Sequence, residues 1–459
     1  MSFATINPTT EEIIKEYEGH SEKEILELLE RSKHAFNDWK NTSFTTRSDL
    51  LLKVEKNLLD NKEDYARTMA LEMGKPLAQG IAEVEKSAWV CRYYAENASD
   101  QLADQDYEAN GSKNYVAFQP LGPVFSIMPW NFPFWQVFRF AAPAVMAGNT
   151  VVLKHSPNTT EAGIRIEEMF KEAGFPENVF TNLIIGQKDV PKYASMIIEN
   201  RNIYGVTLTG SNLSGAKVAE KAGSVLKKSV LELGGSDPYI ILEDADLENA
   251  ADKCITARML NAGQTCIAAK RFIVVEDVHD DFLELCIDKV RKIKPGDPLE
   301  EGITMGPLAR KDLQLNLHRQ VVDSIANKAK CNFGGVMSDG KGFFFTPTIL
   351  SNVKKGMPVF DEEVFGPVAA IIKVKDEKEA ITAANDTSYG LGAAVFTRDI
   401  ERGNRIARNE IRAGSCFVNN FVKSDPRLPF GGIKESGYGR ELSEYGIKEF
   451  VNIKTISIA

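Results

Sequence analysis

Hydrophobic residues in the first hundred positions recur with the spacing of amphipathic helices. The segment Ser21–Glu24 has the form of a capping box, and hydrophobic residues at helical spacing follow it. Gly74-Lys75-Pro76 interrupts the pattern, and residues 77–102 resume it. The pattern predicts a helical N-terminal segment with a break near residue 75.

The period changes near residue 120, where short β-prone hydrophobic runs begin to alternate with amphipathic segments. Strands that alternate with helices are typical of a parallel, doubly wound α/β sheet. Two such series predict two α/β domains. The first has strands at 122–128, 150–153, 181–185, 204–209, 228–233 and 238–242 and helices at 158–173, 188–199 and 213–223. The second, from about 246 to 425, has strands near 270–275, 367–374, 391–397 and 415–419 and helices near 277–292, 309–329, 376–385 and 399–411.

The last residues, 450–458, alternate between hydrophobic and polar side chains. A strand at this position needs a neighbour for its N–H and C=O groups. We regard it as a candidate for pairing with another subunit.

Composition and charge narrow the class of protein. The 459 residues are 43% hydrophobic and 26% charged, as in ordinary globular proteins, and roughly 150 residues per domain suggests about three domains. The net charge of −9 comes without a sustained basic block, which argues against nucleic-acid binding. The hydrophobic runs are too short to span a membrane and the N-terminus lacks the pattern of a signal peptide, so we expect a cytoplasmic protein with no membrane partner.

The cysteines and histidines give no indication of a metal site. Six cysteines are scattered without a CxxC pair, and the five histidines show no HExxH motif. This pattern favours reduced thiols over disulfides or zinc ligands. We therefore expect no metal.

A glycine turn follows the predicted strand 204–209. Gly210 and Ser211 precede a predicted helix, and backbone N–H groups at a helix N-terminus can bind phosphate oxygens. A P-loop requires lysine where Ser211 stands, which excludes an ATPase of that type. The alternative is that Gly210 only permits a tight turn.

Two further residues are candidates for chemistry. Glu232 lies inside a hydrophobic strand before two glycines, where burial would raise its pKa toward the range of a general base. It would lack that role if it pointed outward from an edge strand. Cys266 follows a predicted helix among small and polar residues and is a candidate nucleophile; the alternative is an inert buried thiol.

Taken together, these segments resemble the aldehyde dehydrogenase superfamily over almost the whole chain. The motifs that carry the resemblance, in family order, are Pro129-Trp130-Asn131-Phe132-Pro133, Leu153-Lys154-His155-Ser156-Pro157, Thr209-Gly210-Ser211, Leu231-Glu232-Leu233-Gly234-Gly235, Gly263-Gln264-Thr265-Cys266, Glu362-Glu363-Val364-Phe365-Gly366-Pro367, Pro429-Phe430-Gly431-Gly432 and Ser436-Gly437-Tyr438-Gly439-Arg440-Glu441.

The resemblance implies a role for each catalytic candidate. Cys266 would attack the aldehyde as a thiolate, and the Asn131 amide with the Cys266 N–H would stabilise the oxyanion. Hydride transfer to a nicotinamide would leave a thioester, and Glu232 would activate the water that hydrolyses it. The glutamate distinguishes this chain from the coenzyme-A-acylating branch, which typically lacks it.

The resemblance also implies a nicotinamide cofactor, either NAD or NADP. Many NAD-preferring members have a glutamate three positions after the lysine that matches Lys154, where it would repel a 2′-phosphate; this chain has Pro157. The preference therefore stays open. The implied cofactor contacts are Trp130, Lys154, Gly210, Ser211, Gly234, Glu363 and Phe365.

Arg139 suggests the class of substrate. It lies eight residues past Asn131 on a helix that lines the substrate tunnel in the superfamily, where members similar to succinate-semialdehyde dehydrogenases carry arginine. A guanidinium there would bind the carboxylate of succinate semialdehyde or a similar aldehyde. The alternatives are an arginine at the helix surface or one paired with an acid across a domain interface. Trp135 would wall the tunnel, and Ser424 and Arg427 are further candidates for the carboxylate.

The implied architecture is a cofactor domain (1–102 and 121–233), a catalytic domain (234–434) and a β-flap (103–120 and 446–459) that builds homodimers or homotetramers. Three rival functions remain. They are a broad aliphatic or phosphorylated-aldehyde dehydrogenase, a catalytically silent scaffold, and a cysteine hydrolase or acyltransferase, which lacks an evident histidine near Cys266 in sequence.

Overall fold

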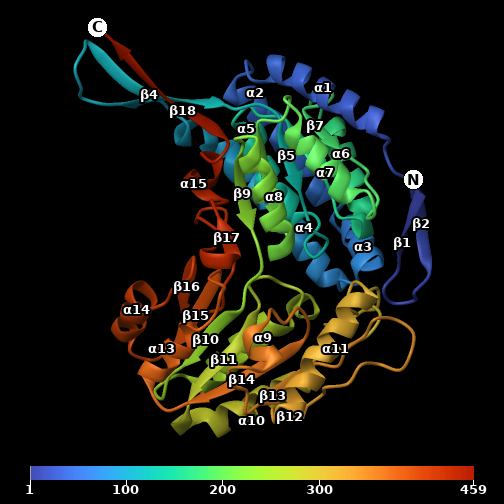
Figure 1. The fold of residues 1–459 in the computed structure, drawn as a ribbon, viewed down its shortest axis with the longest axis vertical. Coiled ribbons are helices and arrows are strands. Elements are labelled where there is room, and N and C mark those ends of the chain that lie inside the picture. Colours follow the sequence, from blue (N-terminus) through green and yellow to red (C-terminus); the bar gives the residue numbers. More distant parts are fainter. Residues whose placement is uncertain (1) are drawn as a thin grey trace.

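A computed structural model describes residues 2–459 and divides the molecule between two large sheets (Figure 1). One sheet has six strands and the other seven, and two smaller sheets of two and three strands complete the fold. The six-stranded sheet occupies the upper half of Figure 1 and the seven-stranded sheet the lower half. The two predicted α/β series correspond to these two sheets with one correction: the strand predicted at 238–242 as the last of the first series is β10 (Asp237–Ile241) of the seven-stranded sheet.

The N-terminal segment is largely helical, as predicted. The Ser21–Glu24 capping box forms, and the helix break falls at Gly74, whose φ of 79° is left-handed. The helices are α1 (Glu22–Trp39), α2 (Phe44–Asp60), α3 (Lys62–Met73) and α4 (Leu77–Gln101).

The helical expectation missed a β-hairpin at the start of the chain, β1 (Ser2–Ile6) and β2 (Ile13–Glu18). Most side chains of β2 are exposed, so the segment has no clear two-residue hydrophobic period. Contacts far along the chain hold it instead: Lys15 forms an ion pair with Glu161, and the Tyr17 hydroxyl donates to the same carboxylate. Local pattern could not reveal partners so distant in sequence.

The six-stranded sheet has the order β17-β9-β8-β5-β6-β7, and all neighbours are parallel except β17 and β9. The strand order reverses at β5, and in open α/β sheets ligands bind beyond the carboxyl ends of the strands at such a point. Its elements are β5 (Val124–Ile127), α5 (Trp135–Met146), β6 (Val151–Lys154), η1 (Pro157–Thr159), α6 (Thr160–Glu172), β7 (Phe180–Asn182), α7 (Val190–Glu199), β8 (Gly205–Thr209), α8 (Asn212–Ser224), β9 (Lys228–Glu232) and β17 (Gly437–Tyr438).

The seven-stranded sheet has the order β12-β13-β14-β11-β10-β15-β16 and is parallel apart from the antiparallel edge strand β12. The sequence predicted most of its strands and helices, but not the edge pair β12 and β13 or the short helix α12, and it gave no bounds for the helix before Cys266, which is α9. Its elements are β10 (Asp237–Ile241), α9 (Leu247–Met259), η2 (Leu260–Gly263), β11 (Ala269–Val275), η3 (Glu276–Val278), α10 (His279–Val290), α11 (Lys311–Ala326), β12 (Lys330–Phe333), β13 (Thr348–Ser351), α12 (Pro358–Asp361), β14 (Val368–Val374), α13 (Glu377–Asn385), β15 (Gly392–Phe396), α14 (Ile400–Asn409), β16 (Ser415–Val418) and η4 (Lys434–Ser436).

The C-terminal strand pairs within its own chain. β18 (Val451–Ile458) runs antiparallel to β4 (Lys113–Pro120), which also pairs with β3 (Gln105–Asp106). The short helix α15 (Ser443–Ile447) precedes it. The β4–β18 arm projects from the body, and β18 is an edge strand of its sheet (Figure 1).

The chain crosses twice between the two large sheets, and the two crossings lie side by side. Leu233 N–H donates to the Ser436 carbonyl at 3.0 Å, and the Ser436 hydroxyl donates to the Gly234 carbonyl at 2.6 Å. Glu232 ends β9 at this seam. None of the helices within residues 2–459 combines the length and hydrophobicity needed to cross a membrane.

Candidate active site

Cys266 stands at the end of a tightly bent segment between α9 and β11. Asn261, Ala262 and Gly263 have φ values of 54°, 53° and 72°, a left-handed run that includes two residues other than glycine. Such conformations cost energy and persist where surrounding contacts hold them. Cys266 is half-buried, whereas Cys254 on α9 is fully buried. The cysteine singled out by sequence is therefore not enclosed in the core.

Two buried cations hold this segment. Lys270 Nζ donates to the carbonyls of Cys266 and Thr265 at 2.7 and 3.0 Å and lies 3.4 Å from Glu363 Oε1. Arg258 Nη2 donates to the carbonyls of Gly263 and Val364 at 3.2 and 3.0 Å. These contacts tie the cysteine segment to the loop that carries Glu363.

The Asn131 side chain points at the cysteine segment. Its Nδ2 donates to the Gln264 carbonyl at 2.9 Å, and its own backbone carbonyl accepts from Lys75 Nζ at 2.9 Å and Asn261 Nδ2 at 2.8 Å. An amide nitrogen carries two N–H groups, and the Gln264 carbonyl uses one. The other is available to an oxygen bound near Cys266.

A buried ion pair between Lys75 and Glu83 supports Asn131. Glu83 Oε1 accepts the backbone N–H groups of Phe134 and Trp135 at 2.9 and 3.0 Å, which caps the start of α5. A carboxylate at a helix N-terminus satisfies free N–H groups and the helix dipole. The pair fixes the loop before α5, because Lys75 donates to the Asn131 carbonyl while Glu83 accepts the N–H groups at the start of the helix.

Burial raises the pKa of the Cys266 thiol to about 11, although the positive charges of Arg139 and Lys270 oppose the shift. The thiol is therefore the dominant form at neutral pH. Attack on a carbonyl requires that its proton be removed.

Glu232 lies in the interior between β8 and β17, at 2% exposure, rather than pointing outward from an edge strand. Within residues 2–459 neither of its carboxylate oxygens has a hydrogen-bond partner. Burial and then the nearby Glu441 raise the pKa of Glu232 well above its usual value. The expectation of a raised pKa is confirmed, and a buried carboxylate with free lone pairs suits a base that must accept a proton from water.

Arg139 lies on α5 in the interior and already has an acid partner. Its guanidinium forms an ion pair with Glu441, donates from Nη2 to the Thr209 hydroxyl at 3.2 Å, and lies 4.6 Å from the centre of the Phe430 ring. Of the roles left open by sequence, the structure shows the pairing with an acid. Glu441 therefore competes with a substrate carboxylate for this arginine.

The other substrate candidates separate into two groups. Trp135 and Ser424 are buried at 4% and 7% exposure and meet at one further cation, Lys86. Lys86 Nζ donates to the Ser424 hydroxyl at 2.8 Å and lies 4.3 Å from the centre of the Trp135 ring. Arg427 is exposed and forms a bidentate pair with Asp425, so the structure does not bring it to this cluster.

A groove of about 620 Å³ lies at the carboxyl ends of β5, β6 and β8, where the strand order reverses. Lys154, Gly210 and Trp130 line it, as does the first turn of α8. Burial lowers the pKa of Lys154 to about 8. The Ser211 hydroxyl is engaged as the N-cap of α8, with Ser214 N–H as its donor, so backbone N–H groups rather than this hydroxyl suit a pyrophosphate.

The remaining cofactor candidates lie on the cysteine side. The Phe365 and Trp130 rings pack edge to face at 5.8 Å, and the Gly235 N–H donates to Glu363 Oε1 at 3.0 Å. A Cβ at Gly234 would lie 2.5 Å from Glu363 Oε2, which explains the glycine. A basic groove with free backbone N–H groups at one end and an aromatic pair near a thiol fits a dinucleotide with a nicotinamide ring.

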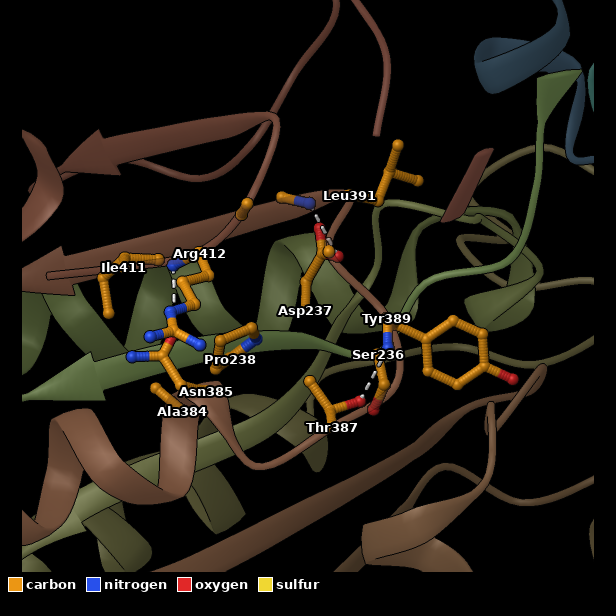
Figure 2. A pocket seen from close by; sticks show the side chains of 13 residues that line it. Ser236, Asp237, Pro238, Ala384, Asn385, Thr387, Tyr389, Leu391, Ile411 and Arg412 are labelled. Carbon is orange, nitrogen blue, oxygen red and sulfur yellow. Dashed lines mark hydrogen bonds between the residues drawn. The ribbon is translucent and has the colours of Figure 1, made fainter. Parts of the chain in front are cut away.

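A second, much smaller cavity lies at the start of β10, between the end of α13 and the segments that precede β15 and β16 (Figure 2). Asp237 reaches into it, accepts the Gly392 N–H at 3.0 Å, and has a pKa raised by burial to about 7. Its volume of about 10 Å³ suits one water at most. This cavity cannot hold an aldehyde.

Sequence reasoning missed several charged residues around the site, because nothing in the local pattern shows their burial or their partners. They are Lys75, Glu83, Arg258, Lys270 and Glu441, which are buried, and Lys86, which is half-buried.

Known proteins are similar to this chain over almost its whole length. The model of the aldehyde dehydrogenase family matches residues 1–456. A probable NADP(+) succinate-semialdehyde dehydrogenase of Synechocystis sp. is 45% identical over 459 residues, which is 100% of both chains. An aldehyde dehydrogenase of Paenarthrobacter nicotinovorans is 42% identical over 99% of each chain.

Solved structures agree in fold. The succinic semialdehyde dehydrogenase of Streptococcus pyogenes, in complex with NADP+, superposes with a TM-score of 0.96 at 37% identity and 99% coverage of both chains. An NAD-dependent aldehyde dehydrogenase of Sinorhizobium meliloti gives a TM-score of 0.96 at 34% identity, covering 99% of this chain and 91% of the other.

Proposed function

The chain belongs to the aldehyde dehydrogenase family and is an NAD(P)-dependent oxidoreductase, and we propose that it oxidises succinate semialdehyde with NADP through Cys266. The observation that supports the catalytic assignment is that Asn131 Nδ2 donates to the Gln264 carbonyl, two residues before the half-buried Cys266. The relatives named as succinate-semialdehyde dehydrogenases support the choice of substrate.

In the proposed first step, the Cys266 thiol gives its proton to water, and the resulting thiolate Sγ bonds to the aldehyde carbon. The carbonyl oxygen becomes an oxyanion, which accepts the free Nδ2 N–H of Asn131 and the backbone N–H of Cys266. One such donor typically contributes about 3 to 4 kcal/mol to the transition state. The chemistry that NADP supplies when bound is the acceptance of a hydride.

In the proposed second step, Glu232 accepts a proton from the water that attacks the thioester carbon. The bond to Cys266 Sγ breaks, the acid is released, and the sulfur is restored for another turnover. The lack of a hydrogen-bond partner on either Glu232 oxygen supports this role.

The preference for NADP is proposed from the charge of the groove. Lys154, Ser156 and Lys217 line it, and Pro157 supplies no carboxylate to repel a 2′-phosphate. Lys217 is exposed on α8 and forms no ion pair within residues 2–459, so its ammonium is available to a phosphate. The NADP(+) named for the relatives supports the same choice.

We also propose the domain roles and a homo-oligomer. Residues 1–102 and 121–233 would hold the cofactor, residues 234–434 would carry the nucleophile, and the flap of 103–120 and 446–459 would join subunits. The edge position of β18 and the exposure of Ile453 and Ile458, at 61% and 48%, support association through this arm. Mass measurement in solution would contradict this part if the protein were a monomer.

The test of the function is a matrix of two aldehydes and two cofactors. We expect kcat/KM to be highest for succinate semialdehyde with NADP, and at least about tenfold lower for butanal, which has the same chain length without the carboxylate. Equal values for the two aldehydes would favour a broad aliphatic dehydrogenase, and higher values with NAD would refute the proposed cofactor.

A further inference from the structure

Building on the proposed substrate, we propose that Lys86 binds the distal carboxylate of the aldehyde, together with the Ser424 hydroxyl. The cluster of Lys86, Ser424 and Trp135 has the chemistry of such a site, with a cation, a hydroxyl donor and a flat hydrophobic wall. Neither the family motifs nor the helix that carries Arg139 pointed to Lys86, which lies in the middle of α4.

The argument begins with the partners of the neighbouring cations. Lys75 is paired with Glu83, and Arg139 is paired with Glu441. Lys86, by contrast, forms no ion pair anywhere in the described range of residues 2–459, and its hydrogen bond goes to the neutral Ser424 hydroxyl. It is a cation beside Trp135 and Ser424 whose charge no ion pair within residues 2–459 neutralises.

The acids close to Lys86 are engaged elsewhere. Glu83 accepts from Lys75 and from the start of α5, and Asp425 is held in a bidentate pair by Arg427. A cation withdrawn from water without a carboxylate is costly unless a ligand supplies one. A carboxylated substrate would supply that missing charge.

The donors available match a carboxylate. An ammonium has three N–H donors, and Ser424 accepts one of them, which leaves two for a ligand. The Ser424 hydroxyl can also donate its own hydrogen to the second carboxylate oxygen. The Trp135 ring, with Lys86 Nζ 4.3 Å from its centre, would then cover the methylene groups.

The site connects to the reacting centre through Arg139. The positive charge of Arg139 acts on the pKa of both Lys86 and Cys266. Trp135 and Arg139 are one helical turn apart on α5, which aligns them on the same face. A short chain with a carboxylate at one end and an aldehyde at the other fits this arrangement.

The proposal predicts a pH signature. Burial first, and then the positive charge of Arg139, lower the pKa of Lys86 to about 8; Glu83 and Asp425 raise it, and Lys423 lowers it. Lys86 is thus charged below about pH 8 and neutral above it. The KM for a carboxylated aldehyde should rise above that pH, whereas the KM for butanal should not.

The experiment measures the ratio of kcat/KM for succinate semialdehyde to that for butanal, because effects on folding, Cys266 or the cofactor cancel in the ratio. Lys86→Met should lower the ratio by about 10- to 100-fold, and Lys86→Arg should retain most of it. Lys86→Arg should also abolish the fall of the ratio above pH 8, since a guanidinium stays charged. Lys423→Met, which removes an exposed charge from the neighbouring loop, is the matched control and should change the ratio by less than about twofold.

The outcomes separate this proposal from the function on which it rests. A wild-type ratio near one overturns the substrate class and the role of Lys86 with it. A clear wild-type preference that survives Lys86→Met overturns the role of Lys86 alone. Equal losses for both aldehydes leave the ratio unchanged and also overturn it, because they indicate a purely structural lysine. If Lys86→Met fails to fold, the pH profile of Lys86→Arg decides, and a retained fall above pH 8 overturns the proposal.

Discussion

Lys75 and Lys86 belong to the same part of the molecule, one just before α4 and the other within it, yet their surroundings are opposite. Lys75 is 1% exposed and contacts the Glu83 carboxylate, the Asn131 carbonyl and the Phe132 ring. Lys86 contacts a hydroxyl and a ring, with no carboxylate. A buried cation with its own acid builds the scaffold, and one without an acid is left to bind a ligand.

The comparison first requires that the catalytic step and the binding of the substrate carboxylate can be measured separately. Cys266→Ala should reduce kcat by more than about 10⁴-fold, because it removes the nucleophile, while succinate binding, measured by calorimetry, should stay near the wild-type value. Cys331→Ala is the control, since Cys331 is exposed and away from the site, and should leave kcat unchanged. Residual turnover in Cys266→Ala comparable to wild type would refute the assigned nucleophile.

The comparison predicts that replacing the paired lysine, Lys75, causes a large loss of stability. Lys75→Met leaves Glu83 buried without its partner and should lower the free energy of unfolding by about 3 to 5 kcal/mol in denaturant titrations. It should also lower kcat, because the Asn131 carbonyl loses a donor. The matched control is Lys62→Met, which breaks the exposed Lys62–Glu85 pair between α3 and α4 and should cost about 1 kcal/mol or less. Similar losses in the two variants would contradict the distinction between buried and exposed pairs.

Glu232 extends the comparison to a buried acid without a partner. Since its pKa is raised, the deprotonated base becomes available only as pH increases, so thioester hydrolysis should accelerate with pH through that raised pKa. Glu232→Gln should lower the steady-state rate by about 100-fold and remove this acceleration. A burst of about one reduced cofactor per subunit should remain in stopped-flow experiments. If Glu232→Gln shows no burst and keeps the wild-type pH profile, another base performs the hydrolysis.

The smallest expected effect concerns a paired cation at the surface. Arg427 is fully engaged by Asp425, so Arg427→Ala should change kcat/KM for succinate semialdehyde by less than about twofold. The same assay on Ser424→Ala, which removes a contact of Lys86, should show a clear increase in KM. An effect of Arg427→Ala larger than that of Ser424→Ala would assign the carboxylate to the loop instead.

Much of the fold could be predicted because the spacing of hydrophobic residues along most segments agrees with the burial of their side chains. The central strands of both large sheets, such as β5 and β10, are buried on both faces, so their largely hydrophobic runs predict them directly. The hairpin β1–β2 and the edge strands β12 and β13 could not be predicted in the same way. Their pairing depends on neighbours that are distant in sequence, and their side chains are largely exposed or, in β13, too few to show a period.

The sequence alone determined the family and most of the two α/β series, and it led to the proposed reactive residues, because motifs around Cys266, Glu232 and Asn131 require particular residue types at particular turns. Tertiary structure decided which charges are neutralised. Arg139 meets Glu441 some three hundred positions away, and Lys86 meets Ser424 at a similar separation, so no local pattern could tell which cation keeps its charge for a ligand. The physical reason is that the energy of a buried charge depends on the partners that folding brings to it, and these lie far apart along the chain.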